Sequence, residues 1–94
     1  MNTRYEIYFQ LNTRNTKKNL EKDILFFTTD KSPLIPKGIY IDFFDFHFEA
    51  MDVFYDPINN YQMVTGKTFI YTDGQMYKVK IDKLIGKGFA KDLS

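Results

Sequence analysis

The sequence predicts a mostly β fold, with a β-rich α+β fold as the alternative. Several segments alternate between apolar and polar residues, which is the pattern of half-buried strands. Aromatic residues favour strands and make up 18% of the chain. No strand–helix–strand rhythm typical of parallel sheets is present. We therefore expect residues 1–94 to form one domain, a small antiparallel sheet that is strongly bent or closed into a small barrel. It would have about five or six strands and at most a short helical turn.

The N-terminal part contains two predicted strands. Residues 4–11 alternate strictly between apolar and polar side chains. Residues 24–29 are β-branched, aromatic or leucine, which favours a second strand. Between them, 16–22 follow a polar stretch and are predicted to form the helical turn. Residues 30–38 contain two prolines and a glycine, so we expect a loop there.

The longest strand is expected after this loop. Apolar residues alternate at positions 39, 41 and 43 and then at 44, 46 and 48. We interpret this change of parity as a β-bulge near Phe43 and Phe44, which would keep all six side chains on one face. The strand is predicted to continue, after a corner, to Tyr55.

The last third is predicted to contain three more strands. Residues 61–64 and 67–72 are predicted strands. Asp73-Gly74 stands between two alternating runs and predicts a type I′ hairpin, because Gly tolerates positive φ. The partner strand is expected over 76–81.

Composition points to a soluble, cytoplasmic protein. The chain has no cysteine, which excludes disulfides and thiolate zinc sites. We find no apolar stretch suited to a signal peptide and none near the roughly 18 residues of a membrane span. A bias toward Asn, Lys, Ile, Tyr and Phe is typical of small proteins of AT-rich bacteria, phages and mobile elements. A phage-encoded protein would act in the host-cell cytoplasm.

Groups for catalysis are sparse. Two serines stand outside any nucleophile motif, and His47 is the sole histidine. Asp45, His47 and Glu49 share one face of the predicted strand, but such neighbours lie about 6.5–7 Å apart, which is too far for a tight metal site. We therefore predict a non-enzymatic protein without a metal or cofactor.

The charge pattern suggests a protein-binding surface. Residues 1–38 hold seven Lys or Arg and four acids (+3), 39–62 hold five acids and no Lys or Arg (−5), and 63–94 hold six Lys and three acids (+3). The three segments could simply neutralise one another as adjacent strands. Our first hypothesis is instead a small protein-binding module, such as a phage-type inhibitor or adaptor, that meets its partner through the acidic strand. The candidate contacts are Tyr40, Asp42, Asp45, His47, Glu49 and Asp52.

The second hypothesis is a small β-barrel that binds single-stranded nucleic acid. Such domains place aromatic side chains beside basic ones. The net charge of only +1 argues against this function, since nucleic-acid binders are strongly basic. Self-association through an open edge or face is a further expectation. The candidate nucleic-acid contacts are Tyr8, Lys17, Lys18, Lys78 and Lys80.

Overall fold

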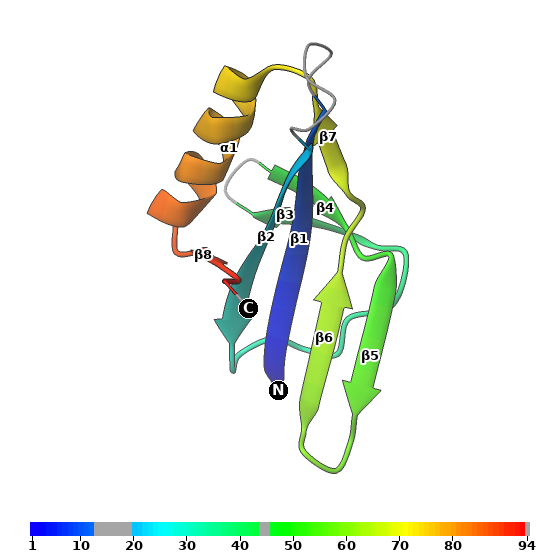
Figure 1. The fold of residues 1–94 in the computed structure, drawn as a ribbon. Helices are drawn as coiled ribbons and strands as arrows, with labels where there is room; N and C mark the ends of the chain where they lie inside the picture. Colours follow the sequence, from blue (N-terminus) through cyan, green and yellow to red (C-terminus); the bar gives the residue numbers. More distant parts are fainter. Residues whose placement is uncertain (13–19, 44–45, 94) are drawn as a thin grey trace.

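The fold is built on a mixed six-stranded sheet (Figure 1). The computed structural model describes residues 1–12, 20–43 and 46–93. The strands of this sheet are β1 (Asn2–Asn12), β2 (Leu20–Thr29), β5 (Asp52–Asp56), β6 (Tyr61–Thr65), β7 (Phe69–Tyr71) and β8 (Ala90–Lys91). Their order is β5-β6-β1-β2-β8, and β7 also pairs with β1.

The central strand β1 has both antiparallel and parallel neighbours. It runs antiparallel to β2, as expected. It runs parallel to β6 and β7, so the expectation of a purely antiparallel sheet is wrong for the β1–β6 and β1–β7 pairs. The prediction considered only direct crossovers between successive strands. Here β2 and β5 both intervene between β1 and β6, so the chain returns to the same direction without a βαβ unit. The sheet ends at β5 and β8 and is not closed into a barrel.

A separate two-stranded sheet consists of β3 (Tyr40–Phe43) and β4 (Phe46–Glu49). Phe43 lies opposite Phe46 in an antiparallel register, so the chain reverses between them and the predicted single long strand is wrong. The reversal explains the change of parity, because apolar residues that lie opposite each other in a hairpin point to the same side. The predicted bulge falls at Phe44, which lies outside the described residues.

The helix α1 (Gly74–Gly86) occupies the place where a type I′ hairpin and a strand over 76–81 were predicted. Asp73 is its N-cap, because the carboxylate accepts two backbone N–H groups of the first turn over 2.8 and 3.3 Å. The helix is also longer than the short turn expected. No helix in the described ranges is long and apolar enough to cross a membrane. Helical spacing places three apolar side chains on the buried face: Tyr77, Ile81 and Leu84.

Both α1 and the hairpin cover the same face of the main sheet. The aromatic rings of Tyr77 and Phe46 each contact Phe9, at centroid distances of 6.5 and 5.9 Å. Alternate residues of β1, from Tyr5 to Leu11, are buried beneath them. No described helix or strand covers the opposite face, which carries the even-numbered residues of β1 and lies open in Figure 1.

The predicted loop over 30–38 is confirmed and is held by Gln62. This side chain is fully buried in β6. Its Nε2 donates to the carbonyl of Pro33 over 2.6 Å and to Thr3 Oγ1 over 2.8 Å. Its Oε1 accepts the N–H of Ile35 over 3.0 Å. The Gln62 amide therefore joins the loop to β6 and to Thr3 of β1.

Four predicted strands are confirmed. Residues 4–11 lie within β1, 24–29 within β2 and 61–64 within β6, and 67–72 contain the shorter β7. Of the predicted helical turn over 16–22, the last three residues belong to β2, and the remainder lies outside the described residues.

Candidate protein-binding surface

The β3–β4 hairpin has two chemically different faces. Side chains alternate between the faces of a strand, and opposite pairs share a face. On the inner face Phe48 is fully buried, and the ring centroid of Phe43 lies 4.9 Å from that of Tyr5. Phe46 packs edge-on against Phe69 at 4.7 Å. These contacts hold the hairpin firmly on the main sheet. The outer face, called here the acidic hairpin face, consists of Tyr40, Asp42, His47 and Glu49.

A contact between an imidazole and a carboxylate crosses this face. His47 Nδ1 lies 2.8 Å from Asp42 Oδ1, and the two side chains are 79% and 72% exposed. Exposed pairs of this kind contribute only about 0–1 kcal/mol to stability. Tyr40 is 72% exposed and lies opposite Glu49. The hairpin thus displays an aromatic ring, an imidazole and two carboxyl groups at little structural cost.

Four of the six candidate contacts are brought together here. Asp52 is exposed three positions beyond Glu49, at the start of β5. Asp45 lies outside the described residues. The predicted one-strand row is replaced by cross-strand pairs, with His47 against Asp42. The change of parity between positions 43 and 44 is also compatible with a chain reversal, which would have predicted the pairing of His47 with Asp42.

Metal binding gains no geometric support in the described ranges. There, no three His, Asp or Glu side chains converge in an arrangement that could hold an ion.

The structure separates the candidates for nucleic-acid binding. Tyr8 lies on the open face of the sheet, where its hydroxyl donates to Glu6 Oε1 over 3.1 Å. Burial, followed by the hydrogen bond to Glu6, raises the pKa of Tyr8. Lys78 and Lys80 belong to α1, which covers the other face. Lys17 and Lys18 lie outside the described residues, and among the other three Tyr8 is on the opposite face of the sheet from the helix that carries Lys78 and Lys80.

The open sheet face carries a charged cluster that sequence reasoning missed. The Arg4 guanidinium lies 4.0 Å from the ring centroid of Phe26. It also pairs with Glu6 and Asp92, each over 3.0 Å. The cluster joins partners 88 positions apart in the chain, which no local pattern could indicate. The cluster contains one basic and two acidic side chains, so the positive charge of Arg4 is already paired.

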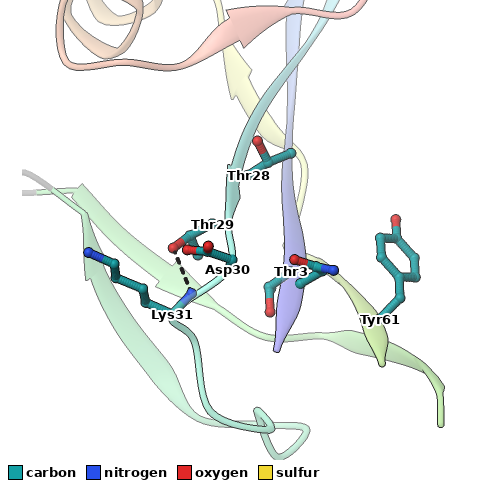
Figure 2. A pocket seen from close by; sticks show the side chains of 7 residues that line it. Thr3, Thr28, Thr29, Asp30, Lys31 and Tyr61 are labelled. Carbon is teal, nitrogen blue, oxygen red and sulfur yellow. Dashed lines mark hydrogen bonds between the residues drawn. The ribbon is translucent and has the colours of Figure 1, made fainter. Parts of the chain in front are cut away.

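A shallow depression lies beside the N-terminus (Figure 2). In it the backbone N–H of Lys31 donates to Thr29 Oγ1 over 3.2 Å. The lining offers hydroxyls, one amide and the side chains of Asp30 and Lys31. No imidazole is present among them to activate a hydroxyl as a nucleophile. The full lining consists of Asn2, Thr3, Thr28, Thr29, Asp30, Lys31 and Tyr61.

Comparison with known proteins gives no match: no protein-family model, curated protein or solved structure is significantly similar to this chain.

Proposed function

We propose that this chain is a small non-enzymatic protein-binding module that docks a basic surface of its partner against the acidic hairpin face. The observation that carries the proposal is the cross-strand grouping of exposed Tyr40, Asp42 and His47 with half-buried Glu49 on one outward face. The buried aromatic inner face supports it, because a firmly packed hairpin loses little conformational freedom on binding.

The charge distribution also supports this assignment. The segment 39–62 contains no Lys or Arg to offset its five acids. A patch of one sign steers an oppositely charged partner and speeds association. Tyr40 adds a large amphipathic side chain of the type that is enriched at interfaces. An inhibitor encoded by a phage or mobile element, acting in the cytoplasm on a nucleic-acid-binding protein, would use such a surface.

Site-specific photo-crosslinking tests the location of this surface. A crosslinking amino acid replaces Tyr40 in one variant and Val79 in a matched variant, because Val79 is 58% exposed on α1, outside the hairpin. In lysate of the source cells, we expect the variant at position 40 to capture one basic protein that the variant at 79 does not. Capture by the variant at position 79 and not by the variant at position 40 would show that the hairpin is not part of the interface.

The captured partner then allows a quantitative test. Asp42→Lys should slow association several-fold at low salt, and the difference should shrink at high salt, because screening weakens steering. Asp82→Lys on α1 introduces the same charge change at an exposed site away from the hairpin and should have a much smaller effect. Equal association rates for the two variants would contradict the proposal.

A further inference from the structure

The outer edge of β5 offers a second kind of contact. β5 is the last strand of the main sheet, and β6 is its neighbour on one side. Among the described residues no strand pairs with its other side. Such an edge presents backbone N–H and C=O groups that can pair with another strand. β5 reads Asp-Val-Phe-Tyr-Asp, without Lys or Pro, and pairs with β6 in continuous register. Its two Asp residues would repel an acidic strand but not a basic one.

The side chains of β5 form a specific alternating pattern. Asp52, Phe54 and Asp56 project on the open face, while Val53 and Tyr55 project on the covered one. Phe54 and Tyr55 remain 60% and 45% exposed, one on each side of the edge. A strand added here would cover both rings with its own side chains.

The Asp56 carboxylate is held by hydrogen bonds from the turn that follows β5. Asp56 accepts hydrogen bonds from Asn59 Nδ2 over 2.7 Å and from the N–H of Ile58 over 3.0 Å. These bonds, with that of Asn59 first, lower the pKa of Asp56. Asp52 is exposed. Arg4, a basic side chain of the open face, is already paired with two other acids.

We infer that β5 binds an extended segment of a partner protein. In this segment every second residue lies on the open face, and three such residues are basic, apolar and basic in that order, the basic ones being Lys or Arg. Backbone pairing would supply affinity, and the alternate side chains would supply selectivity. The two basic residues would lie against Asp52 and Asp56, and the apolar residue against Phe54. Opposite charges on neighbouring strands stabilise each other, whereas like charges repel.

A second copy of this chain fits the edge less well. Antiparallel self-pairing centred on Phe54 would place Asp52 opposite Asp56 of the other copy, at both ends of the pairing. The inference goes beyond the proposed function, since it concerns the sheet edge instead of the hairpin face. Either proposal can therefore fail while the other stands.

A peptide titration followed by NMR tests the inference. The probe is the capped peptide Ser-Lys-Thr-Val-Thr-Lys-Ser, added up to millimolar concentration to the labelled chain. We expect amide shifts centred on 52–56 and slower hydrogen exchange of amides on the outer edge of β5. One control peptide has Glu in place of Lys, and a second has alternate backbone amides methylated. Both should bind much more weakly, because one reverses the charge and the other blocks strand pairing.

Protein variants complete the test. Asp52→Lys should weaken binding by about threefold to tenfold, a range that corresponds to the energies of cross-strand charge pairs. Asp82→Lys on α1 should leave binding unchanged. Absence of shifts at millimolar peptide, shifts confined to other strands, or equal binding of the methylated peptide would overturn the inference. Sedimentation showing a dimer that Asp52→Lys strengthens would assign the edge to a second copy instead, because the substitution turns the like-charge contact with Asp56 of the other copy into an opposite-charge one.

Discussion

The hydroxyl of Tyr77 donates a hydrogen bond to Asp23 Oδ2 over 2.6 Å and joins α1 to β2. Lys91 Nζ approaches the other oxygen of the same carboxylate at 3.7 Å, so β8 takes part in the contact. The ring of Tyr77 is buried against Phe9 at 6.5 Å. One side chain therefore couples the helix to the core by packing and to the sheet by a charge-assisted hydrogen bond.

Tyr77→Phe should lower the free energy of unfolding by about 1–2 kcal/mol. The substitution keeps the ring but removes the donor to a carboxylate, and the expected loss is modest because the Asp23 side chain is 24% exposed and can be rehydrated. Urea unfolding measures the effect. Tyr40→Phe, at a ring that is 72% exposed, is the matched control and should change stability little. Equal stability of the two variants would mean that the hydrogen bond contributes nothing.

Stability should also fall at alkaline pH. Burial, followed by the hydrogen bond to Asp23, raises the pKa of Tyr77 in the folded state. An unfolded tyrosine ionises near pH 10 and the folded one at higher pH, so above about pH 10 the unfolded state releases its proton first and is favoured. The contribution is complete below pH 10 and is lost as pH rises toward the folded pKa. Tyr77→Phe should show a shallower decline between pH 9 and about 11 than the wild type.

Gln62→Leu should destabilise the fold by about 2–4 kcal/mol. The substitution leaves the N–H of Ile35 and the carbonyl of Pro33 without their buried partner. Gln75→Leu, at an exposed position in the first turn of α1, is the control and should be nearly neutral. Urea unfolding of both variants gives the comparison. A loss below about 0.5 kcal/mol for Gln62→Leu would show that water or a rearranged loop replaces the amide.

Gly66→Ala tests the packing between β6 and the hairpin. A Cβ at position 66 would overlap the ring of Phe48, which is fully buried and has little room to move. We expect a loss of about 1–3 kcal/mol from overpacking. Gly86→Ala, where nothing lies within 4 Å of the added carbon, should be neutral or stabilising. Thermal unfolding separates the two outcomes, and equal melting temperatures would show that the Phe48 ring can move aside without loss.

Local patterns predicted the strands with strict alternation. Residues 4–11 became the centre of the sheet because every second side chain is apolar and can be buried on one face. Their parallel neighbours could not be predicted in the same way. The pairing of Asn2 with Tyr61 depends on where several intervening elements pack, which the residues near either position do not encode.

The helix was not predicted because the dipeptide Asp73-Gly74 is compatible with two local structures, a tight turn and the start of a helix. Asp73 and Gly74 fit a tight turn, but Asp is also a favoured N-cap. The spacing of the apolar residues distinguishes the two, since a strand from 76 would bury Val79, whereas a helix leaves Val79 exposed and buries Leu84 instead. Tyr40, Asp42, His47 and Glu49 lie on one face, as they would in the predicted strand, but the pairing of His47 with Asp42 could not be predicted from one continuous strand.

The parallel pairing of β1 with β6 has a consequence for the order in which the fold forms during synthesis. β1 is synthesised before β6, and its register partners in β6 follow 59 positions later, as for Asn2 and Tyr61. Until then one edge of the central strand has no neighbour, and contacts this distant in sequence form slowly. The nascent chain therefore passes through a stage in which β1 and β2 can form a hairpin whose far side is exposed to other chains.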